Sequence, residues 1–305
     1  MGNELIVLTG ATGNLGGRVA GTLLKQGKRV RAIIRCGSSS GRAAKLSRQG
    51  AEIIEADFGS ISDITKACSG GTCVISAISG LRDAIIGAQT VLLEGAIRAG
   101  VPRFIPSDFS IDFTSLPGGT NRNLDLRREF QERLDKAPIA ATSILNGMFT
   151  DLLTGPAPII LFKLKRVLFW EDADQLMDFT TIDNTARFTS DAVTDQSTPR
   201  YLRIGGDQIS ARGLAEVASE VTGMKFRLFR AGSLKRLEKM IRFMRAVYPQ
   251  KGAIYPPWQG MQYLYNMFSG RAKLEPLDND RYPGIKWTSV RDILTAYKSR
   301  VREKP

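Results

Sequence analysis

The feature that most constrains this chain is a glycine-rich turn placed directly after its first apolar run. Residues 5–9 have the short, β-branched character of a buried strand, and Leu15, Val19 and Leu23 then follow at the four-residue spacing of a helix. The segment between them reads Leu8-Thr9-Gly10-Ala11-Thr12-Gly13-Asn14-Leu15-Gly16-Gly17. A strand, a glycine turn and a helix in this order predict the phosphate-binding turn of a Rossmann domain.

Each of the three spaced glycines has its own predicted role. Gly10 permits the tight turn, Gly13 lets main-chain N–H groups approach a diphosphate, and Gly16 lets the helix pack against the strand. The start of the helix adds unpaired N–H groups and the positive end of the helix dipole. The residues predicted to bind a dinucleotide here are Gly10, Thr12, Gly13, Asn14, Leu15 and Gly16.

Arg35 indicates which dinucleotide is bound. It ends the second predicted strand, residues 29–35, where proteins that bind NAD usually carry an acidic residue for the ribose hydroxyls. An arginine there can pair with a 2′-phosphate, assisted by Ser38, Ser39 and Lys45; the alternative is a solvated arginine at a strand end. The sequence therefore predicts NADP(H), with NADPH bound at least about tenfold more tightly than NADH, or about 1.4 kcal/mol.

Strands and helices alternate along the N-terminal half. The predicted strands are residues 5–9, 29–35, 52–56, 73–78 and 103–105. Helical patterns cover residues 41–49, 61–68, 85–99 and about 122–136, and a further strand is expected near 140–145. Such alternation predicts an α/β fold, a doubly wound parallel Rossmann sheet with right-handed crossovers.

The second half has a different pattern after a break rich in glycine and proline at residues 155–158. We expect an NAD(P)-binding domain over residues 1–154 and a smaller mixed α/β lobe over 155–305 that takes a substrate or a partner, although strands after 140 could return to the first sheet. Strands are expected near 159–170 and 176–181, and helices near 183–194, 210–222, 233–247, 255–269 and 289–300.

Composition excludes several kinds of chemistry. The chain has no histidine, so it cannot use a Ser-His-Asp or Cys-His arrangement or a zinc site built on histidine, and no metal site is expected. The basic residues behind its net charge of +13 are spread along the sequence, and we recognise no DNA-binding motif. Direct binding to nucleic acid is therefore not expected. We find no secretory signal and no apolar run long enough for a membrane span, which predicts a cytoplasmic protein.

Three cysteines, Cys36, Cys68 and Cys73, make a disulfide framework unexpected. They are predicted to be small buried apolar residues. The alternative for Cys36, which follows Arg35, is a redox-sensitive thiol beside the cofactor.

Beyond the glycine turn, several segments carry a family resemblance. They are Arg31 to Arg35, Ala56-Asp57-Phe58, Gln89, Ala99-Gly100-Val101-Pro102-Arg103-Phe104, Ile105-Pro106-Ser107-Asp108-Phe109 and Leu145-Asn146-Gly147-Met148-Phe149. With them the chain resembles, over almost its whole length, the NmrA-like branch of the atypical short-chain dehydrogenases, close to the isoflavone reductase-like group. The Phe-Ile-Pro-Ser-Asp-Phe run is its most specific part.

The resemblance implies further cofactor contacts. Asp57 and Phe58 would flank the adenine, and Ala77, Ile78 and Ser79 would line the cofactor after the fourth strand. The residues expected near the nicotinamide end are Pro106, Ser107, Asp108, Asn146, Gly147 and Phe149.

The catalytic pattern of ordinary short-chain dehydrogenases is missing. Their Tyr-x-x-x-Lys pair sits on a helix, whereas the only match here, Tyr282 to Lys286, contains Pro-Gly, which forbids a helix. Isoflavone reductase-like enzymes instead use a lysine on a later helix, and the resemblance assigns that place to Arg127. Arginine cannot exchange a proton, although with Ser107 or water it can stabilise an anion that forms as hydride moves. The alternative for Arg127 is a surface residue or one that forms a salt bridge, for example with Asp125 or Glu129.

Two functions remain open from the sequence. One is an NADPH-dependent reductase of a small hydrophobic or aromatic carbonyl or enone substrate. The other is a non-catalytic regulator that senses NADP(H) and binds a protein partner. The sequence names neither the substrate nor the oligomeric state.

Overall fold

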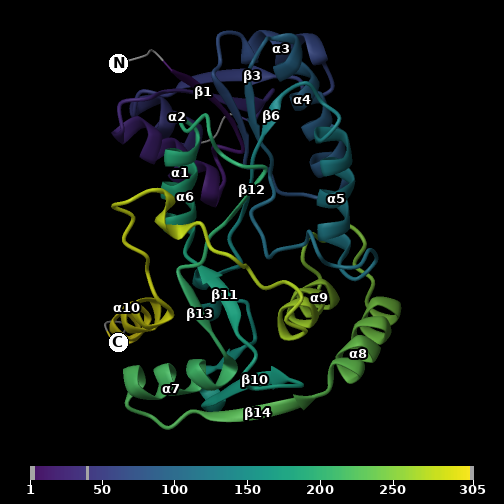
Figure 1. Cartoon of the computed structure of the whole chain (residues 1–305), viewed down its shortest axis with the longest axis vertical. Helices are drawn as coiled ribbons and strands as arrows, with labels where there is room; N and C mark the ends of the chain where they lie inside the picture. Colours follow the sequence, from purple (N-terminus) through teal and green to yellow (C-terminus); the bar gives the residue numbers. More distant parts are fainter. Residues whose placement is uncertain (1–3, 39–40, 303–305) are drawn as a thin grey trace. The chain divides into compact units, whose positions relative to one another are not determined.

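The structure of the chain, a computed structural model, describes residues 4–38 and 41–302 (Figure 1). The chain forms two compact units, and each is built from several separate segments. The first unit comprises residues 1–109, 126–144 and 185–202, and the second comprises residues 110–125, 145–184 and 203–305.

A parallel sheet forms the centre of the first unit. Its strands are β1 (Leu5–Thr9), β2 (Arg29–Arg35), β3 (Glu52–Ala56), β4 (Cys73–Ser76), β5 (Arg103–Ile105) and β6 (Ala140–Ala141). They run in the order β3-β2-β1-β4-β5-β6, and every neighbouring pair is parallel. This order confirms the predicted Rossmann sheet. The direction of winding reverses between β1 and β4, and ligands of such sheets bind beyond the carboxyl ends of the strands at that point.

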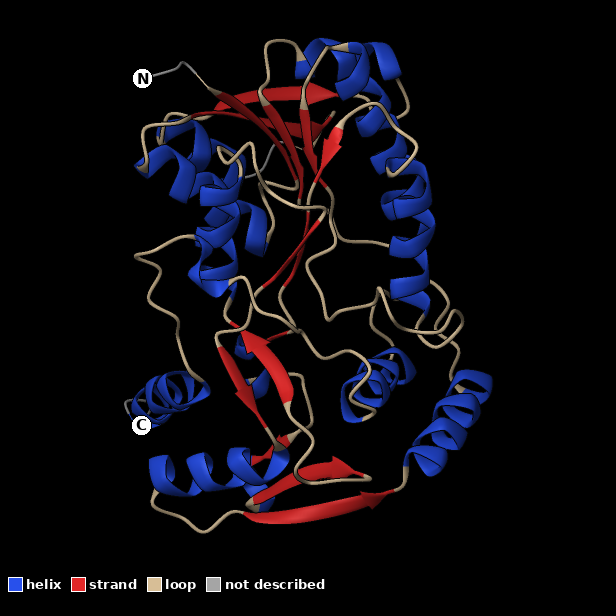
Figure 2. Ribbon diagram, viewed as in Figure 1, coloured by secondary structure: helices blue, strands red, loops and turns tan. Residues whose placement is uncertain are grey.

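Helices cover both faces of this sheet (Figures 1 and 2). They are α1 (Asn14–Lys25), α2 (Gly41–Arg48), α3 (Ile61–Cys68), α4 (Gln89–Arg98), α5 (Arg122–Leu134) and α6 (Ile182–Ala192), and a π-helix, η1 (Asp83–Ala88), precedes α4. A core cluster joins Val7, Val74 and Phe104 of the sheet to α3, α4 and α5. The rings of Phe104 and Phe130 lie 6.2 Å apart within it, so α5 is fixed against the strand that leads into the predicted active-site segment.

Arg103 connects β5 to the end of α6. The side chain is only 8% exposed, and its guanidinium donates to the carbonyls of Val193 (2.6 Å) and Ala192 (3.1 Å) and to Thr198 Oγ1 (2.8 Å). These bonds satisfy carbonyls that a helix end leaves without intrahelical donors.

Replacing Arg103 with methionine is expected to lower the free energy of unfolding by about 2–4 kcal/mol, because buried carbonyls lose a charged donor. Urea denaturation would measure the loss. The matched control is Arg98→Met, since Arg98 is exposed at the end of α4 and should change stability by less than about 0.5 kcal/mol. Equal effects of the two variants would contradict the anchoring role of Arg103.

Among its described residues, the second unit contains two three-stranded sheets and the four helices named below. One sheet has the order β13 (Asp207–Ile209), β11 (Met177–Thr180), β8 (Met148–Phe149), and the other has the order β14 (Arg227–Gly232), β10 (Arg166–Trp170), β9 (Ile160–Leu161). The helices are α7 (Ala211–Thr222), α8 (Leu234–Val247), α9 (Pro257–Phe268) and α10 (Val290–Arg302), with 3₁₀ turns η2 (Thr150–Thr154), η3 (Phe162–Leu164) and η4 (Asn279–Arg281). Two short strands, β7 (Ser143–Leu145) and β12 (Tyr201–Arg203), pair with each other, and the first two residues of each belong to the first unit.

The division of the chain differs from the single cut expected after residue 154. Strand β6 pairs with β5 in the first sheet. Most of α6 also belongs to the first unit, where Gln26 of that unit donates to Asp191 (2.6 Å). Residues 110–125 instead belong to the second unit. Local patterns cannot reveal this, because it depends on which distant segments pack together.

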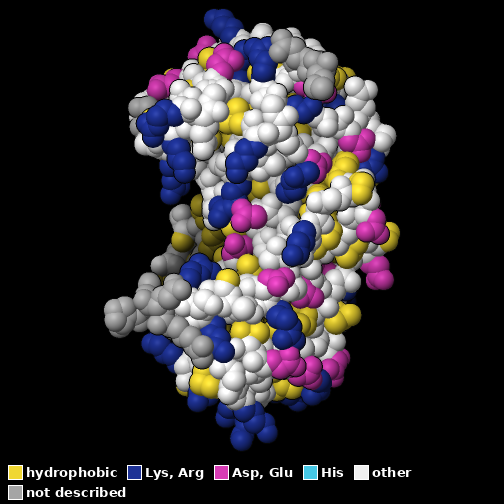
Figure 3. All heavy atoms as spheres, turned by 90° about the vertical axis from the view of Figure 1, so that its left-hand side faces the viewer, with side chains coloured by type: hydrophobic (Ala, Val, Ile, Leu, Met, Phe, Trp, Pro, Cys, Tyr) yellow, Lys and Arg dark blue, Asp and Glu magenta, His cyan; other side chains and the backbone are white. Residues whose placement is uncertain are grey.

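Surface charge is mixed on the face drawn in Figure 3, where Lys and Arg side chains are scattered and Asp and Glu side chains lie among them. Among the described residues, no helix combines the length and the apolar character that crossing a bilayer requires.

Candidate functional site

The glycine turn has the geometry that the sequence predicts. Gly10 adopts a left-handed φ of +74°, and its carbonyl accepts a hydrogen bond from Gly13 N–H at 2.9 Å. Helix α1 begins at Asn14, directly after the turn, with no capping side chain and no acidic residue in its first turn. Its first N–H groups therefore form a cradle of positive potential suited to a diphosphate.

Close contacts explain why glycine is required at two positions of the turn. A Cβ on Gly10 would lie 2.3 Å from the carbonyl oxygen of Ala77, and one on Gly16 would lie 2.2 Å from the carbonyl oxygen of Gly10. Both neighbours are main-chain atoms that cannot move aside. At Gly13 the corresponding approach, to Gly10 O, is 3.0 Å. The packing role predicted for Gly16 agrees with this geometry.

A pocket of about 590 Å³ lies beyond the ends of β2 and β3 in the same unit. It brings together Arg35, Asp57 and Phe58, which the sequence assigned to the adenosine end of the cofactor. The full lining is Arg35, Cys36, Ala56, Asp57, Phe58, Gly59, Asp83, Gly87, Ala88 and Val91. This volume is within the usual range for small-molecule sites. The contribution of η1 could not be foreseen, since a π-helix has no sequence signature.

Arg42 is a basic residue of this site that the sequence reasoning missed. It lies in the first turn of α2 and donates to the carbonyl of Thr12 (3.0 Å), so its charge lies beside the glycine turn. Lys45 is exposed on the same helix, one turn further on, and neither Arg42 nor Lys45 is among the residues that line the pocket. Ser38 Oγ donates to the carbonyl of Arg35 (2.6 Å), and Ser39 lies outside the described residues. The only feature of the sequence that could have identified Arg42 is its position one helical turn before Lys45.

The three cysteines differ in environment. Cys68 and Cys73 are buried, and burial raises the pKa of each thiol to about 12, which fits the predicted role as small apolar residues. Cys36 is exposed and lines the pocket beside Arg35, so the prediction of burial is wrong for this residue.

Ser107 links the ends of β4 and β5. Its hydroxyl donates to the carbonyl of Ile78 (2.5 Å), and its main-chain N–H donates to Gln89 Oε1 (2.9 Å). Ser107 is only 4% exposed, and Pro106 is buried as well, whereas Ala77, Ile78 and Ser79 are accessible. The hydroxyl thus has a structural task, and its predicted role toward a substrate stays a prediction.

Arg127 is buried rather than solvated. It is 8% exposed, and its Nε donates to the carbonyl of Ser107 (3.0 Å), which ties α5 to the segment after β5. Asp108 is completely buried nearby, and its Oδ2 accepts from Ser143 Oγ (2.7 Å) and Gln131 Nε2 (3.1 Å). The carboxylate of Asp108 therefore faces an internal polar network.

Burial raises the pKa of Asp108 above its usual range. Hydrogen bonds from Ser143 and Gln131 and the charges of Arg127 and Arg200 counteract part of this effect. Because the folded pKa is the higher one, the folded chain binds more protons than the unfolded chain between the two pKa values. The free energy of unfolding therefore falls as pH rises through that window.

The variant Asp108→Asn removes this titration and keeps an acceptor for Ser143. At about pH 7 we expect the free energy of unfolding of this variant to equal or exceed that of the unaltered chain. The difference between the two free energies should narrow toward about pH 4, and urea denaturation would measure it. Glu132→Gln, on the exposed side of α5, is the control. If Asp108→Asn retains the pH profile of the unaltered chain, Asp108 is not the responsible group.

Asn146, Gly147 and Phe149 belong to the second unit. The N–H groups of Asn146 and Gly147 both donate to the carbonyl of Ser110, at 2.9 and 3.1 Å. Gly147 has a φ of +67°, and a Cβ there would lie 2.4 Å from the carbonyl oxygen of Asp178. Asn146 is fully buried, and Phe149 is half-buried. Their predicted place over the nicotinamide remains a prediction.

Two negative expectations can be compared with the described residues. Tyr282 to Lys286 form a turn and an irregular segment, so the Tyr-x-x-x-Lys match lacks the helix that would align it. Within residues 4–38 and 41–302, no group of three or more acidic or cysteine side chains is placed to hold a metal ion.

Comparisons with known proteins extend over almost the whole chain. The model of the NmrA-like family matches residues 2–281. The bifunctional pinoresinol-lariciresinol reductase of Linum usitatissimum is 24% identical over 316 residues, covering 97% of this chain and 100% of the relative. Among solved structures, AtPrR2 with NADP⁺ and (+)-pinoresinol has a TM-score of 0.82 at 19% identity, covering 97% of this chain and 99% of that one. The leucoanthocyanidin reductase–NADPH complex of Vitis vinifera has a TM-score of 0.80 at 17% identity, with 97% and 99% covered.

Proposed function

This chain belongs to the NmrA-like family, and from that premise we propose that it is an NADPH-dependent reductase of a small hydrophobic or aromatic carbonyl or enone compound. The observation that carries the proposal is the uncapped start of α1 beside a pocket that carries Arg35. The relatives support it, since the Linum usitatissimum relative is a reductase and the Vitis vinifera structure is a reductase in complex with NADPH.

The residues of the first unit fit the cofactor. Main-chain N–H groups of Asn14 and Leu15 would hold the diphosphate, because they lie at the uncapped start of α1. Further residues of the site are assigned by charge and position. Arg35 and Arg42 would pair with the 2′-phosphate, and Asp57 and Phe58 would contact the adenine.

NADPH, when bound, supplies the hydride. Arg127 would supply positive charge for the oxygen that gains electron density, and it stays protonated throughout. Ser107 holds the end of β4 against the end of β5 through its bond to Ile78, and its carbonyl fixes Arg127 Nε. Because the chain has no histidine, and arginine cannot exchange a proton, the proton must come from water or from another side chain.

Purified full-length chain, incubated with NADPH and a panel of aryl ketones, quinones and enones, tests the proposal through the absorbance of NADPH. Sustained consumption with one class of substrate is the expected result. Gly16→Val, which blocks the turn, is the control for background oxidation. Tight NADPH binding with no consumption across the panel would overturn the reductase and favour the cofactor-sensing regulator.

A further inference from the structure

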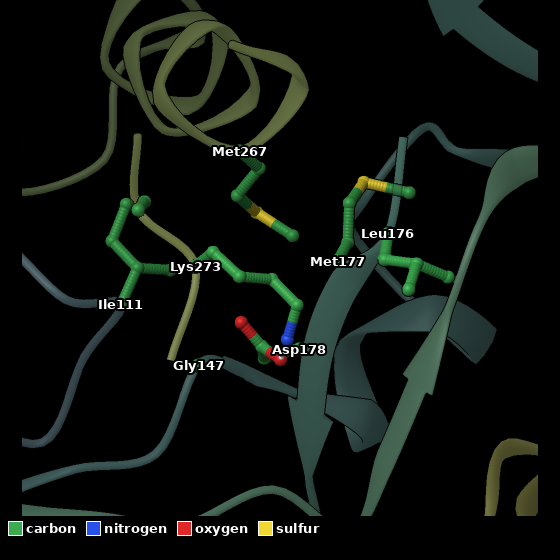
Figure 4. Close-up of a pocket in the computed structure, with 8 residues that line it drawn as sticks. Ile111, Gly147, Leu176, Met177, Asp178, Met267 and Lys273 are labelled. Carbon is green, nitrogen blue, oxygen red and sulfur yellow. Dashed lines mark hydrogen bonds and ion pairs between the residues drawn. The ribbon is translucent and has the colours of Figure 1, made fainter. Parts of the chain in front are cut away.

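The pocket of the second unit that Figure 4 shows is too small for an organic ligand. Its enclosed space is about 10 Å³, which is about the room that one water molecule needs. Lys273 reaches across it to Asp178, and the two form a buried ion pair. The carboxylate of Asp178 also accepts from Gln208 Nε2 (2.7 Å) and from the main-chain N–H of Leu274 (2.7 Å), so the fold itself satisfies it. A larger partner of this unit must therefore bind elsewhere.

Helix α8 and the loop that follows it, residues 234–255, concentrate positive charge. Basic residues occur throughout the sequence, but this segment has six of them and a single acidic residue, Glu238, for a net charge of +5. All six are exposed, namely Lys235, Arg236, Lys239, Arg242, Arg245 and Lys251. Within the described part of the chain, only Arg242 of these six forms an ion pair, with Glu238 (3.1 Å). The other five charges face solvent without a carboxylate partner.

The same segment exposes apolar side chains that the fold does not use. Leu237 and Ile241 are the buried residues of α8, which packs against α9. Phe243 and Val247 lie on another side of the helix and are 64% and 56% exposed. Lys239, Phe243 and Val247 follow one another at four-residue spacing, so a cation and two apolar side chains share that side.

The loop after α8 extends this combination. Tyr248 and Tyr255 are 48% and 63% exposed. The loop is held beside the helix, because Trp258 Nε1 donates to the carbonyl of Pro249 (3.0 Å) and the guanidinium of Arg245 lies 5.4 Å from the Trp258 ring. We call the six cations, together with Phe243, Val247, Tyr248 and Tyr255, the α8 surface. Figure 1 shows α8 at the margin of the second unit, with α9 on its inner side.

The exposed apolar residues are clustered rather than scattered. Nine large apolar side chains are exposed among the described residues, and four of them belong to the α8 surface. Single exposed apolar residues are normal on a protein, whereas a cluster indicates a surface that binds a partner.

The partner that fits both features is a bilayer with anionic headgroups. Such a surface attracts Lys and Arg and also accepts apolar side chains and tyrosine at the boundary between headgroups and acyl chains. A second copy of the chain would bring a net charge of +5 against +5, which opposes association. Nucleic acid would attract the cations but offers no apolar environment for Val247. Lysine is depleted at protein interfaces, and three of the six cations are lysines.

We propose that the α8 surface docks the second unit on an anionic membrane surface. The cations contact headgroup phosphates, and Phe243 and Val247 enter the outer edge of the acyl region. The 14 residues of α8 span about 21 Å, less than the hydrocarbon thickness of a bilayer, so the helix lies on the membrane and its buried side stays packed in the protein. This docking is separate from the proposed reductase activity.

Cosedimentation of the full chain with lipid vesicles tests the proposal. The two kinds of vesicle are an equimolar mixture of phosphatidylglycerol and phosphatidylcholine, and phosphatidylcholine alone. We expect binding to the anionic vesicles to be at least about tenfold tighter than to the neutral ones. Raising the salt concentration from about 0.1 M to about 0.5 M should weaken that binding, because the headgroup charges are screened.

The charge requirement is tested by Lys235→Gln/Lys239→Gln, which removes two exposed cations of α8. Affinity for the anionic vesicles should fall by about thirtyfold. Lys25→Gln/Lys66→Gln makes the same change of charge at exposed lysines of α1 and α3, outside the α8 surface, and should bind like the unaltered chain.

The apolar requirement is tested by Phe243→Ser/Val247→Ser. Affinity for the anionic vesicles should fall by about tenfold, because two apolar side chains no longer enter the bilayer. Leu164→Ser/Met224→Ser, at two exposed apolar residues outside the α8 surface, is the matched control and should retain the affinity. All four double variants change exposed side chains, and circular dichroism would check that each is folded.

Several results would overturn the proposal. They are the absence of binding to either kind of vesicle, equal binding to both kinds, and equal affinities of an α8-surface variant and its matched control. Binding to poly-glutamate or to single-stranded RNA, with none to vesicles, would assign the surface to an acidic protein or to nucleic acid instead. The assay involves no turnover, so its outcome is independent of the NADPH-consumption test.

Discussion

Replacing Gly10 with alanine is expected to abolish cofactor binding. The added Cβ would meet the carbonyl oxygen of Ala77 at 2.3 Å, and a φ of +74° is unfavourable for any residue with a side chain. The turn must then open away from β4, which moves the N–H groups that would hold the diphosphate. We expect NADPH affinity to fall by more than about a hundredfold and the free energy of unfolding to fall by about 2 kcal/mol or more. Titration of NADPH fluorescence and urea denaturation would measure the two effects.

The same helix offers a matched control for this substitution. A Cβ on Gly21 of α1 would have no heavy atom within 4 Å. Gly21→Ala should therefore bind NADPH like the unaltered chain and gain about 0.5–1 kcal/mol of stability, because alanine is the better helix former. If Gly10→Ala and Gly21→Ala bound NADPH equally well, the phosphate site would have to lie elsewhere.

The double variant Arg35→Ala/Arg42→Ala is expected to remove the preference for NADPH over NADH. In the unaltered chain that preference should be at least about tenfold, because a guanidinium pairs with a 2′-phosphate by charge-assisted hydrogen bonds. Loss of both arginines should weaken the binding of NADPH by about ten- to a hundredfold. The dissociation constants of NADPH and NADH should then become similar. Titration of each cofactor by fluorescence provides the measurement.

Two further variants separate charge from structure in this experiment. Arg42 also donates a hydrogen bond to the carbonyl of Thr12. Its loss can therefore loosen the glycine turn and weaken the binding of NADPH and NADH alike. Arg42→Lys keeps the charge and should keep part of the preference for NADPH. Arg48→Ala, at the exposed far end of α2, should alter neither constant. A double variant that still prefers NADPH as strongly as before would refute the assignment.

Much of the first unit could be predicted because its signals are local. Five parallel strands, including β1 and β2, begin and end at or near the expected residues, since short β-branched runs bounded by turn residues form buried strands. The glycine turn could be predicted for the same reason. Each of its glycines is required by a close contact with a residue near it in sequence or directly after the neighbouring strand β4.

Features that depend on distant residues were not predictable. The π-helix η1 overlaps the start of a segment that the sequence predicts as one continuous helix from 85 to 99. Strand β13 exists because it pairs with β11, about thirty residues earlier, and its own three residues carry no strand pattern. The inward orientation of the Asp108 carboxylate depends on Gln131 and Ser143, which are contributed by later elements. The pairing of Lys273 with Asp178 joins segments that no local pattern connects.

The discontinuous make-up of the two units limits how this protein can be dissected. A peptide that stops at residue 154 would lack residues 185–202 of the first unit, and so the carbonyls at the end of α6 that Arg103 binds. It would also carry residues 110–125 without the rest of the second unit. No single proteolytic nick can release either unit intact, and a gene fusion that borrows only the nucleotide-binding half must take three separate stretches of coding sequence.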